Sequence, residues 1–226
     1  MRLKSLFLLD MRFQAKYGFY FLYAVLTLIY AIALMAVPES WKEKTAVILI
    51  FSDPASMGLF FMGAIVLLEK SQHTPCAFAV SPVLVEEYII AKVSSLSAIS
   101  LVVAAILALT AGVDNLHIVL LGTVISSVIF TLLGIIIATK IISLNQFILW
   151  TVPIEIVCFV PAILHLFKIT PAGLRYYPIN VCMEMVSGYA PSAIGIFIVI
   201  ALMAILLVLS KYCVLKMWNS MGGVKL

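Results

Sequence analysis

Two carboxylates lie inside long apolar stretches of this sequence, where an ionisable group could do chemistry. Asp53 is followed by Pro54, and Glu155 lies between Pro153 and Pro161. A carboxylate at bilayer depth costs about 3 kcal/mol on insertion scales and usually faces a protein interior or a water-filled cavity. Either acid could line the path of a cationic cargo or exchange a proton. Alternatively, Asp53 could cap a helix that starts there, and Glu155 could stay protonated and hydrogen-bond a neighbouring helix.

No motif for catalysis or nucleotide binding accompanies these acids. The sequence contains no GxxxxGK[ST], HExxH or GxSxG pattern. His73, His117 and His165 fall in separate segments and are not expected to form one metal site. The four cysteines are scattered singly, which favours neither a disulfide framework nor a zinc site. We therefore expect no enzyme, no metal site and no cofactor bound by this chain.

The composition predicts an integral membrane protein. Of the 226 residues, 65% are hydrophobic and 11% are charged, with a mean hydropathy of +1.22. Soluble domains are about 25% charged, and a soluble fold could not hide this much apolar surface. In lipid the backbone polar groups must be satisfied within each segment, so we expect an all-α polytopic fold.

Six segments are long and apolar enough to cross a bilayer, which needs about 20 residues each. They are residues 18–37, 45–68, 93–111, 116–139, 146–167 and 191–210. No internal repeat, linker or second core is evident. Residues 1–226 are therefore expected to form a single transmembrane domain.

The two ends of the chain are basic and short. Residues 1–17 alternate apolar and basic side chains at helical spacing, which predicts an interfacial helix; the alternative is a basic end that obeys the positive-inside rule. No cleavage site follows Met1 to Lys4, so this start is expected to be retained. The tail from Lys211, with Trp218, is expected to anchor the last helix at the interface.

The distribution of Lys and Arg predicts the orientation. With six crossings, both termini share one side with ten basic residues: Arg2, Lys4, Arg12, Lys16, Lys70, Lys92, Lys140, Lys211, Lys216 and Lys225. The other side has four: Lys42, Lys44, Lys168 and Arg175. We therefore expect cytoplasmic termini in the plasma membrane, and a cytoplasmic loop between the second and third spans.

That loop has a helical pattern of its own. Glu69 and Lys70 close the second span, and residues 74–80 form a short mixed segment. Ser81–Pro82 reads as the start of the next helix, since Ser favours the N-cap and Pro the first turn. The pattern predicts a short helix across the membrane face, able to press into a groove on a soluble protein. Alternatively, Glu69, Lys70 and Lys92 snorkel at span ends and Ser81–Pro82 is an ordinary turn.

The segment between the fifth and sixth spans is punctuated by Pro and Gly. Tyr176, Tyr177 and Tyr189 suit a membrane interface. Residues 179–186 could form a short amphipathic helix around Glu184. The alternative is a plain surface loop.

The chain resembles permeases of the ABC-2 transporter family, most nearly the fluoroquinolone or multidrug exporters. Leu-Glu-Lys at 68–70, Ser-Pro at 81–82, Glu-Tyr at 87–88 and Ala-Lys at 91–92 carry the resemblance. The span order, the flat N-terminal helix and the polar segment before the last span match as well. The sequence departs from the family after Lys70, where Ser71 follows instead of the usual Gly.

The resemblance implies a coupling helix at residues 74–80 that docks on a separate ATPase, and short external helices that roof the exit path. The implied coupling residues are Glu69, Lys70, Thr74, Ala77, Phe78, Ala79, Val80, Ser81, Pro82, Glu87 and Tyr88.

The expected protein is the permease subunit of an ATP-binding cassette exporter. It would work with two ATPase subunits that bind ATP and Mg, a second identical or related permease chain, and lipid, but no nucleic acid. The alternative is a self-contained proton-coupled secondary transporter that uses Asp53 or Glu155.

Overall fold

The computed structural model is a helical bundle and describes residues 2–53, 58–113, 115–174 and 176–222. Three residues named in the sequence analysis lie outside these ranges: Pro54, Arg175 and Lys225. The elements in chain order are α1 Arg2–Lys16, α2 Phe19–Ala36, α3 Glu39–Ser52, α4 Gly58–Ser71, α5 Thr74–Ala79, α6 Val85–Ala111, α7 Leu116–Lys140, α8 Leu144–Leu166, the 3-10 turn η2 Ala172–Leu174, α9 Pro178–Val186 and α10 Ala193–Gly222. Within the described ranges there is no strand, so the all-α prediction is confirmed.

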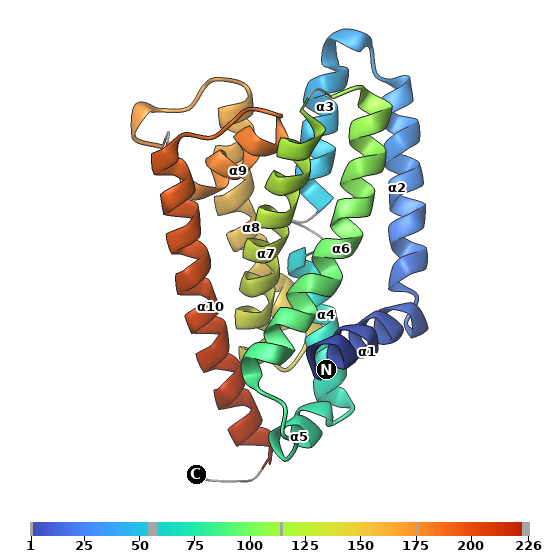
Figure 1. Ribbon diagram of the computed structural model, residues 1–226, viewed down its shortest axis with the longest axis vertical. Coiled ribbons are helices and arrows are strands. Elements are labelled where there is room, and N and C mark those ends of the chain that lie inside the picture. The colour runs from blue at the N-terminus through green and yellow to red at the C-terminus, as the bar shows by residue number, and fades with distance from the viewer. Residues whose placement is uncertain (1, 54–57, 114, 175, 223–226) are drawn as a thin grey trace.

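Among the described residues, five helices are long and apolar enough to cross a membrane: α2, α6, α7, α8 and α10. The predicted span 45–68 is instead divided between α3 and α4, which follow one another along the bundle (Figure 1). α3 ends at Ser52, and Asp53 follows it as the C-cap with a helical backbone. Asp53 therefore stands at the C-terminal end of α3, and its N–H donates to the carbonyl of Leu49. The expectation that Asp53 caps a helix starting there stays a prediction, because residues 54–57 lie outside the described ranges.

Two further boundaries differ from the sequence expectations. α6 begins at Val85, after the predicted helix start at Ser81–Pro82 and before the predicted start of the span at residue 93. The Glu87 carboxylate accepts a hydrogen bond from the N–H of Leu84 (3.0 Å) and so caps the first turn of α6. Ser81 is not the N-cap; its hydroxyl donates to the carbonyl of Phe78 (2.9 Å), just past the end of α5. α10 continues well past residue 210, so the predicted tail is helical.

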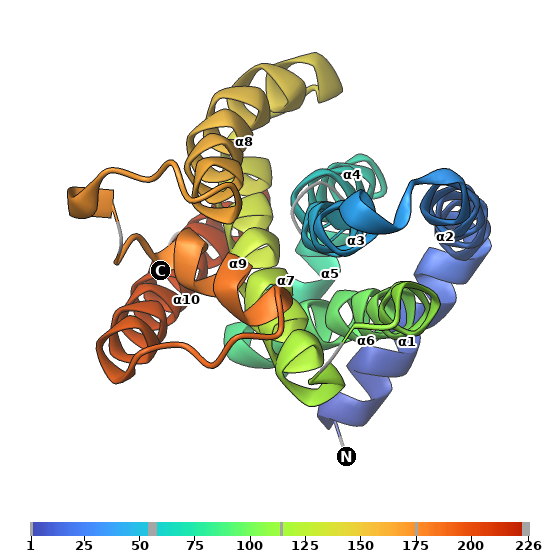
Figure 2. The same ribbon diagram turned by 90° about the horizontal axis from the view of Figure 1, so that it is seen from above.

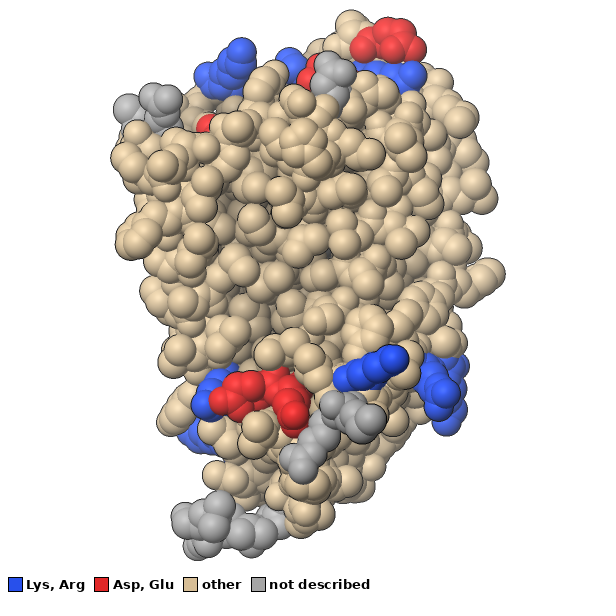
Figure 3. Space-filling view, viewed as in Figure 1, with Lys and Arg blue, Asp and Glu red and all other residues tan. Residues whose placement is uncertain are grey.

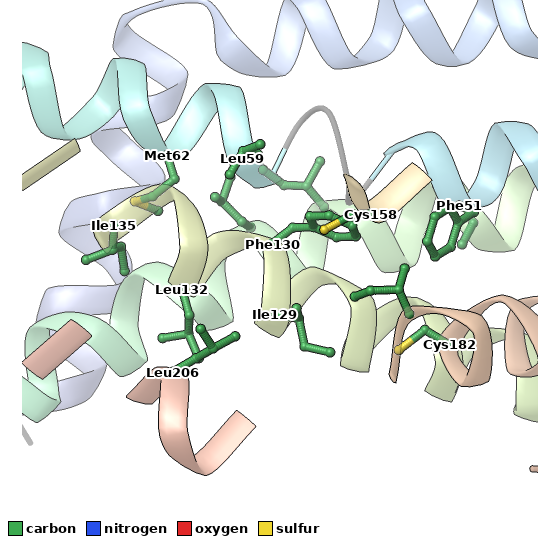
Figure 4. Close-up of a cluster of buried hydrophobic side chains, with 14 of the residues drawn as sticks. Phe51, Leu59, Met62, Ile129, Phe130, Leu132, Ile135, Cys158, Cys182 and Leu206 are labelled. Atoms are coloured by element: carbon green, nitrogen blue, oxygen red, sulfur yellow. The ribbon is translucent and has the colours of Figure 1, made fainter. Parts of the chain in front are cut away.

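Helix α7 lies at the centre of the bundle, as the view from above shows (Figure 2). In the most hydrophobic segment of α7, 61% is buried inside the bundle. The corresponding value for α2, at the periphery, is 11%. Gly134 allows α4 to approach closely, because a Cβ there would lie 2.8 Å from the carbonyl oxygen of Leu59. In the core of the bundle, Phe51, Met62 and Phe130 pack with branched aliphatic side chains (Figure 4).

The bundle has two unlike ends. α1, α5 and the last turns of α10 lie at one end, here called the α5 end; η2 and α9 lie at the other, the α9 end (Figure 1). In the view of Figure 3, charged side chains gather at both ends and an uncharged band separates them. This distribution is what a bilayer with water on both sides requires.

Candidate functional site

Helix α5 is held by an aromatic cluster. Phe78 stacks on Trp218 of α10, with ring centroids 5.7 Å apart and planes at 22°, and meets Tyr88 of α6 edge-on at 5.4 Å. Trp218 is only 5% exposed, so the expected interfacial anchor is a packing residue instead. Pro75 is buried under the first turn of α5. Because Phe78 packs against both α6 and α10, a displacement of α5 would push directly on these two helices.

The outer surface of this region is apolar. Val80 is 76% exposed and Leu84 58% exposed, and Ala77 and Pro82 are exposed beside them. The remaining residues of the expected coupling set in this stretch are half-buried: Thr74, Phe78, Ala79 and Ser81. The expected docking segment thus has an outward face that carries no charge.

Two residues of the expected coupling set, Glu69 and Tyr88, point into the protein instead, as does the neighbouring Lys92. Lys92 donates to Glu69 (2.7 Å) and to Asp10 (2.8 Å), and the Tyr88 hydroxyl donates to the second oxygen of Glu69 (2.6 Å). The side chains of Lys92, Asp10 and Glu69 are 3%, 5% and 8% exposed. Burying three charges is tolerated because each is paired and hydrogen-bonded. Lys92 therefore does not snorkel, and Glu69 and Tyr88 point into the protein.

Sequence reasoning missed the contribution of α1 to this cluster. Asp10 accepts hydrogen bonds from Gln14 (2.8 Å) and from the hydroxyl of Ser95, and Gln14 also donates to Ser95 (2.9 Å). The signal was present: Asp10 and Gln14 are spaced i, i+4 and so share one face of α1. We call Asp10, Gln14, Glu69, Tyr88, Lys92 and Ser95 the Lys92 network. It ties α1, α4 and α6 together at the α5 end.

Lys70 and Glu87 cap helices in this structure. The Lys70 ammonium donates to the carbonyl oxygens of Ala138 (2.7 Å), Thr139 (2.9 Å) and Ile141 (2.8 Å), satisfying the C-terminus of α7. Glu87 caps the start of α6. Lys70 therefore links α4 to α7, whereas Glu87 acts only within α6.

The intramembrane acids differ in their surroundings. Asp53 is 2% exposed and hydrogen-bonded to Ser100 of α6, while its Oδ2 atom has no hydrogen-bond partner among the described residues. Glu155 is half-exposed on α8, which keeps Pro153 and Pro161 inside the helix. Within the described ranges no three His, Cys, Asp or Glu side chains gather in a way that could hold a metal ion.

The α9 end contains a cavity. This cavity of about 820 Å³ lies between the end of α8, the loop after it, α9 and the loop before α10. On its wall, His165 Nε2 lies 2.8 Å from Glu184 Oε1, and His165 Nδ1 lies 3.1 Å from the Thr170 hydroxyl. The short helix predicted at 179–186 is present as α9, with Glu184 on it.

A second contact holds α9 against α8. The Tyr177 hydroxyl, just before α9, donates to the carbonyl of Val157 at 3.4 Å. Burial, with a smaller contribution from Cys158, raises the pKa of Tyr177 to about 12, so the hydroxyl keeps its proton at physiological pH.

Known proteins resemble this chain over different lengths. The model of the fluoroquinolones export permease protein family matches residues 1–218. Fluoroquinolones export permease proteins from two strains of Mycobacterium tuberculosis are each 32% identical over 100 residues. This match covers 44% of the chain and 42% of the length of each relative. Because the family model spans nearly the whole sequence, the chain belongs to the fluoroquinolones export permease protein family.

Proposed function

We propose that this chain is the transmembrane subunit of an ATP-driven exporter, and that a separate ATPase subunit hydrolyses the ATP. Membership of an export permease family supports export. The observation that carries the coupling is α5 itself: a short helix at one end of the bundle, pinned to α6 and α10 by Phe78 and apolar on its outer face.

The proposed protein crosses the membrane six times. α2, α6, α7, α8 and α10 supply five crossings, and α3 with α4 supplies the sixth. α3 and α4 have 14 residues each, too few alone for the roughly 20 residues that a crossing requires. Stacked end to end they have enough length. An even number agrees with α1 and the last turns of α10 lying at the same end (Figure 1).

The α5 end is proposed to face the cytoplasm. Basic residues outnumber those of the other end ten to four in the sequence. The burial of Lys92 in an ion pair removes it from the surface count but leaves the bias in place. This orientation puts α5 in the compartment that contains ATP.

A moving ATPase would act on the permease through contacts that differ between two states. Pressure on Val80 and its neighbours reaches α10 through Phe78 and Trp218. It reaches α6 through Tyr88, whose hydroxyl leads to Glu69 on α4. The Lys92 network carries the same displacement to α1. Closely packed and hydrogen-bonded elements of this kind can transmit a displacement between helices.

Two permease chains, identical or related, would enclose the path, and two ATPase subunits would bind below them. Asp53 and Glu155 are proposed to face this path, where their charge favours a cationic or amphipathic cargo. ATP and Mg would be held by the ATPase alone.

Co-purification of the permease with a Walker-type ATPase tests the proposal. We expect V80D to lower ATPase association several-fold, because a carboxylate would be desolvated in the contact. The matched control is I169D, since Ile169 is 67% exposed and follows α8 at the opposite end. Equal association of wild type and V80D would remove the role of α5.

The buried Asp53, with its unpaired Oδ2 atom in the described chain, favours a second candidate: a self-contained proton-coupled transporter. The chain alone in proteoliposomes distinguishes the two. Transport driven by a pH gradient, without an ATPase and abolished by D53N, would replace the first proposal with the second.

A further inference from the structure

Among the described residues, the wall of the cavity at the α9 end carries a carboxylate and an ammonium group. Glu184 comes from α9, and Lys168 comes from the turn after α8. In the described part of the chain, no ion pair within 4.0 Å joins Lys168 to Glu184. Two opposite charges that line one cavity without neutralising each other are available to a ligand that carries both signs.

The backbone of Lys168 and the carboxylate of Glu184 are both held by hydrogen bonds. Lys168 has a left-handed backbone (φ 60°), and its N–H donates to the carbonyl of His165 (2.9 Å), closing the end of α8. Glu184 is held through Oε1 by His165, which Thr170 orients from the other side. When His165 donates from Nε2 to the Glu184 carboxylate, its Nδ1 accepts the hydroxyl hydrogen of Thr170. A carboxylate can accept several hydrogen bonds, so Glu184 can still bind an ammonium group.

The rest of the wall suits an apolar body. Tyr176 and Tyr189 are 44% and 65% exposed at the rim, and Leu166, Val181 and Met183 line the cavity behind them. A tyrosine ring also attracts a cation over its face. The volume of about 820 Å³ falls in the range of small-molecule sites, which are lined by apolar groups with a few placed polar ones.

We propose that this cavity binds a zwitterionic amphiphile, with the ammonium group on Glu184, the anionic oxygen on Lys168 and the apolar body between the tyrosines. This binding proposal rests on the proposed function in one respect only: it places the cavity on the outer side of the membrane, where cargo is released. A released cargo molecule and the zwitterionic headgroup of an outer-leaflet lipid share this chemistry.

Direct binding to the purified chain in phosphatidylcholine nanodiscs tests the site without any ATPase. The probe is norfloxacin, a fluorescent fluoroquinolone with one amine and one carboxylate, followed by anisotropy. Its ethyl ester retains only the amine charge, and its N-acetyl derivative retains only the carboxylate charge. We expect E184Q to weaken norfloxacin and the ester about tenfold, as loss of a charge-assisted hydrogen bond implies, and to spare the N-acetyl derivative. K168M should weaken norfloxacin and the N-acetyl derivative and spare the ester.

The matched controls are E39Q and K42M, an exposed ion pair on α3 that does not line this cavity. They should leave all three affinities unchanged. A loss that is the same for the three probes in E184Q and K168M, or no loss in either, would overturn the assignment. Loss of coupling to an ATPase with charge-selective binding intact would overturn the proposed function and leave the site standing.

A lipid arm identifies the source of the ligand. Replacing part of the phosphatidylcholine with phosphatidylethanolamine, whose ammonium can donate hydrogen bonds, should lower norfloxacin affinity if headgroups occupy the cavity. Competition that disappears in E184Q supports a lipid-occupied site. Unchanged affinity, with the charge selectivity of the variants retained, supports a site for released cargo.

Discussion

The two ends of this bundle hold their charges in opposite ways. At the α5 end, Lys92, Asp10 and Glu69 are at most 8% exposed and pair with one another. At the α9 end, His165 and Glu184 are 18% and 33% exposed and face a cavity. The first arrangement uses electrostatics to fix three helices in one geometry. The second leaves charge available to something that arrives.

The largest test of this contrast removes the centre of the Lys92 network. K92M leaves two buried carboxylates without a counter-charge, which should cost about 3–5 kcal/mol of unfolding free energy. Unfolding of the purified chain in detergent measures the loss. K216M is the control, because Lys216 is exposed near the end of α10 and should change stability by less than about 0.5 kcal/mol. A K92M chain as stable as wild type would show that the network does not hold the α5 end.

A combined variant separates charge pairing from packing. Replacing the three charged residues of the network, with D10L, E69L and K92M together, removes the desolvation cost of the charges along with their attraction. Stability should recover most of the loss, since apolar replacements of buried ion pairs are often neutral. If the triple variant regains stability but does not couple to the proposed ATPase, the network serves transmission and not stability alone.

The next largest effect concerns backbone approach. G134A should cost roughly 1–3 kcal/mol, because the new Cβ meets the Leu59 carbonyl at 2.8 Å and backbone cannot move aside cheaply. At the α9 end, G173A should be nearly silent, since nothing lies within 4 Å of a Cβ at that position. Thermal unfolding of the two variants compares a tightly packed region with an open one directly. Equal losses would contradict the contrast.

The sequence was sufficient for the elements whose signal is local. Long apolar runs predicted the spans at α2, α7 and α8 within a few residues, and the amphipathic pattern at residues 179–186 indicated the helix α9 as one of two alternatives. The Lys92 network was not predictable in this way. Its ion pairs join residues 82 and 23 positions apart, and a lysine at a span end reads the same whether it snorkels or pairs. Trp218 was assigned to the interface for a similar reason, because its partner Phe78 is remote in sequence.

The smallest stability effect belongs to the α9 end and separates its role from that of the α5 end. E184Q removes a partly exposed pair with His165, and such pairs contribute about 0–1 kcal/mol. Thermal unfolding of E184Q should therefore stay close to wild type while its affinity for a cationic probe falls. At the α5 end the relation is reversed, because K92M loses stability and touches no ligand. A large loss of stability in E184Q would mean that Glu184, like Lys92, is a structural ion, and that both ends hold their charges for the same purpose.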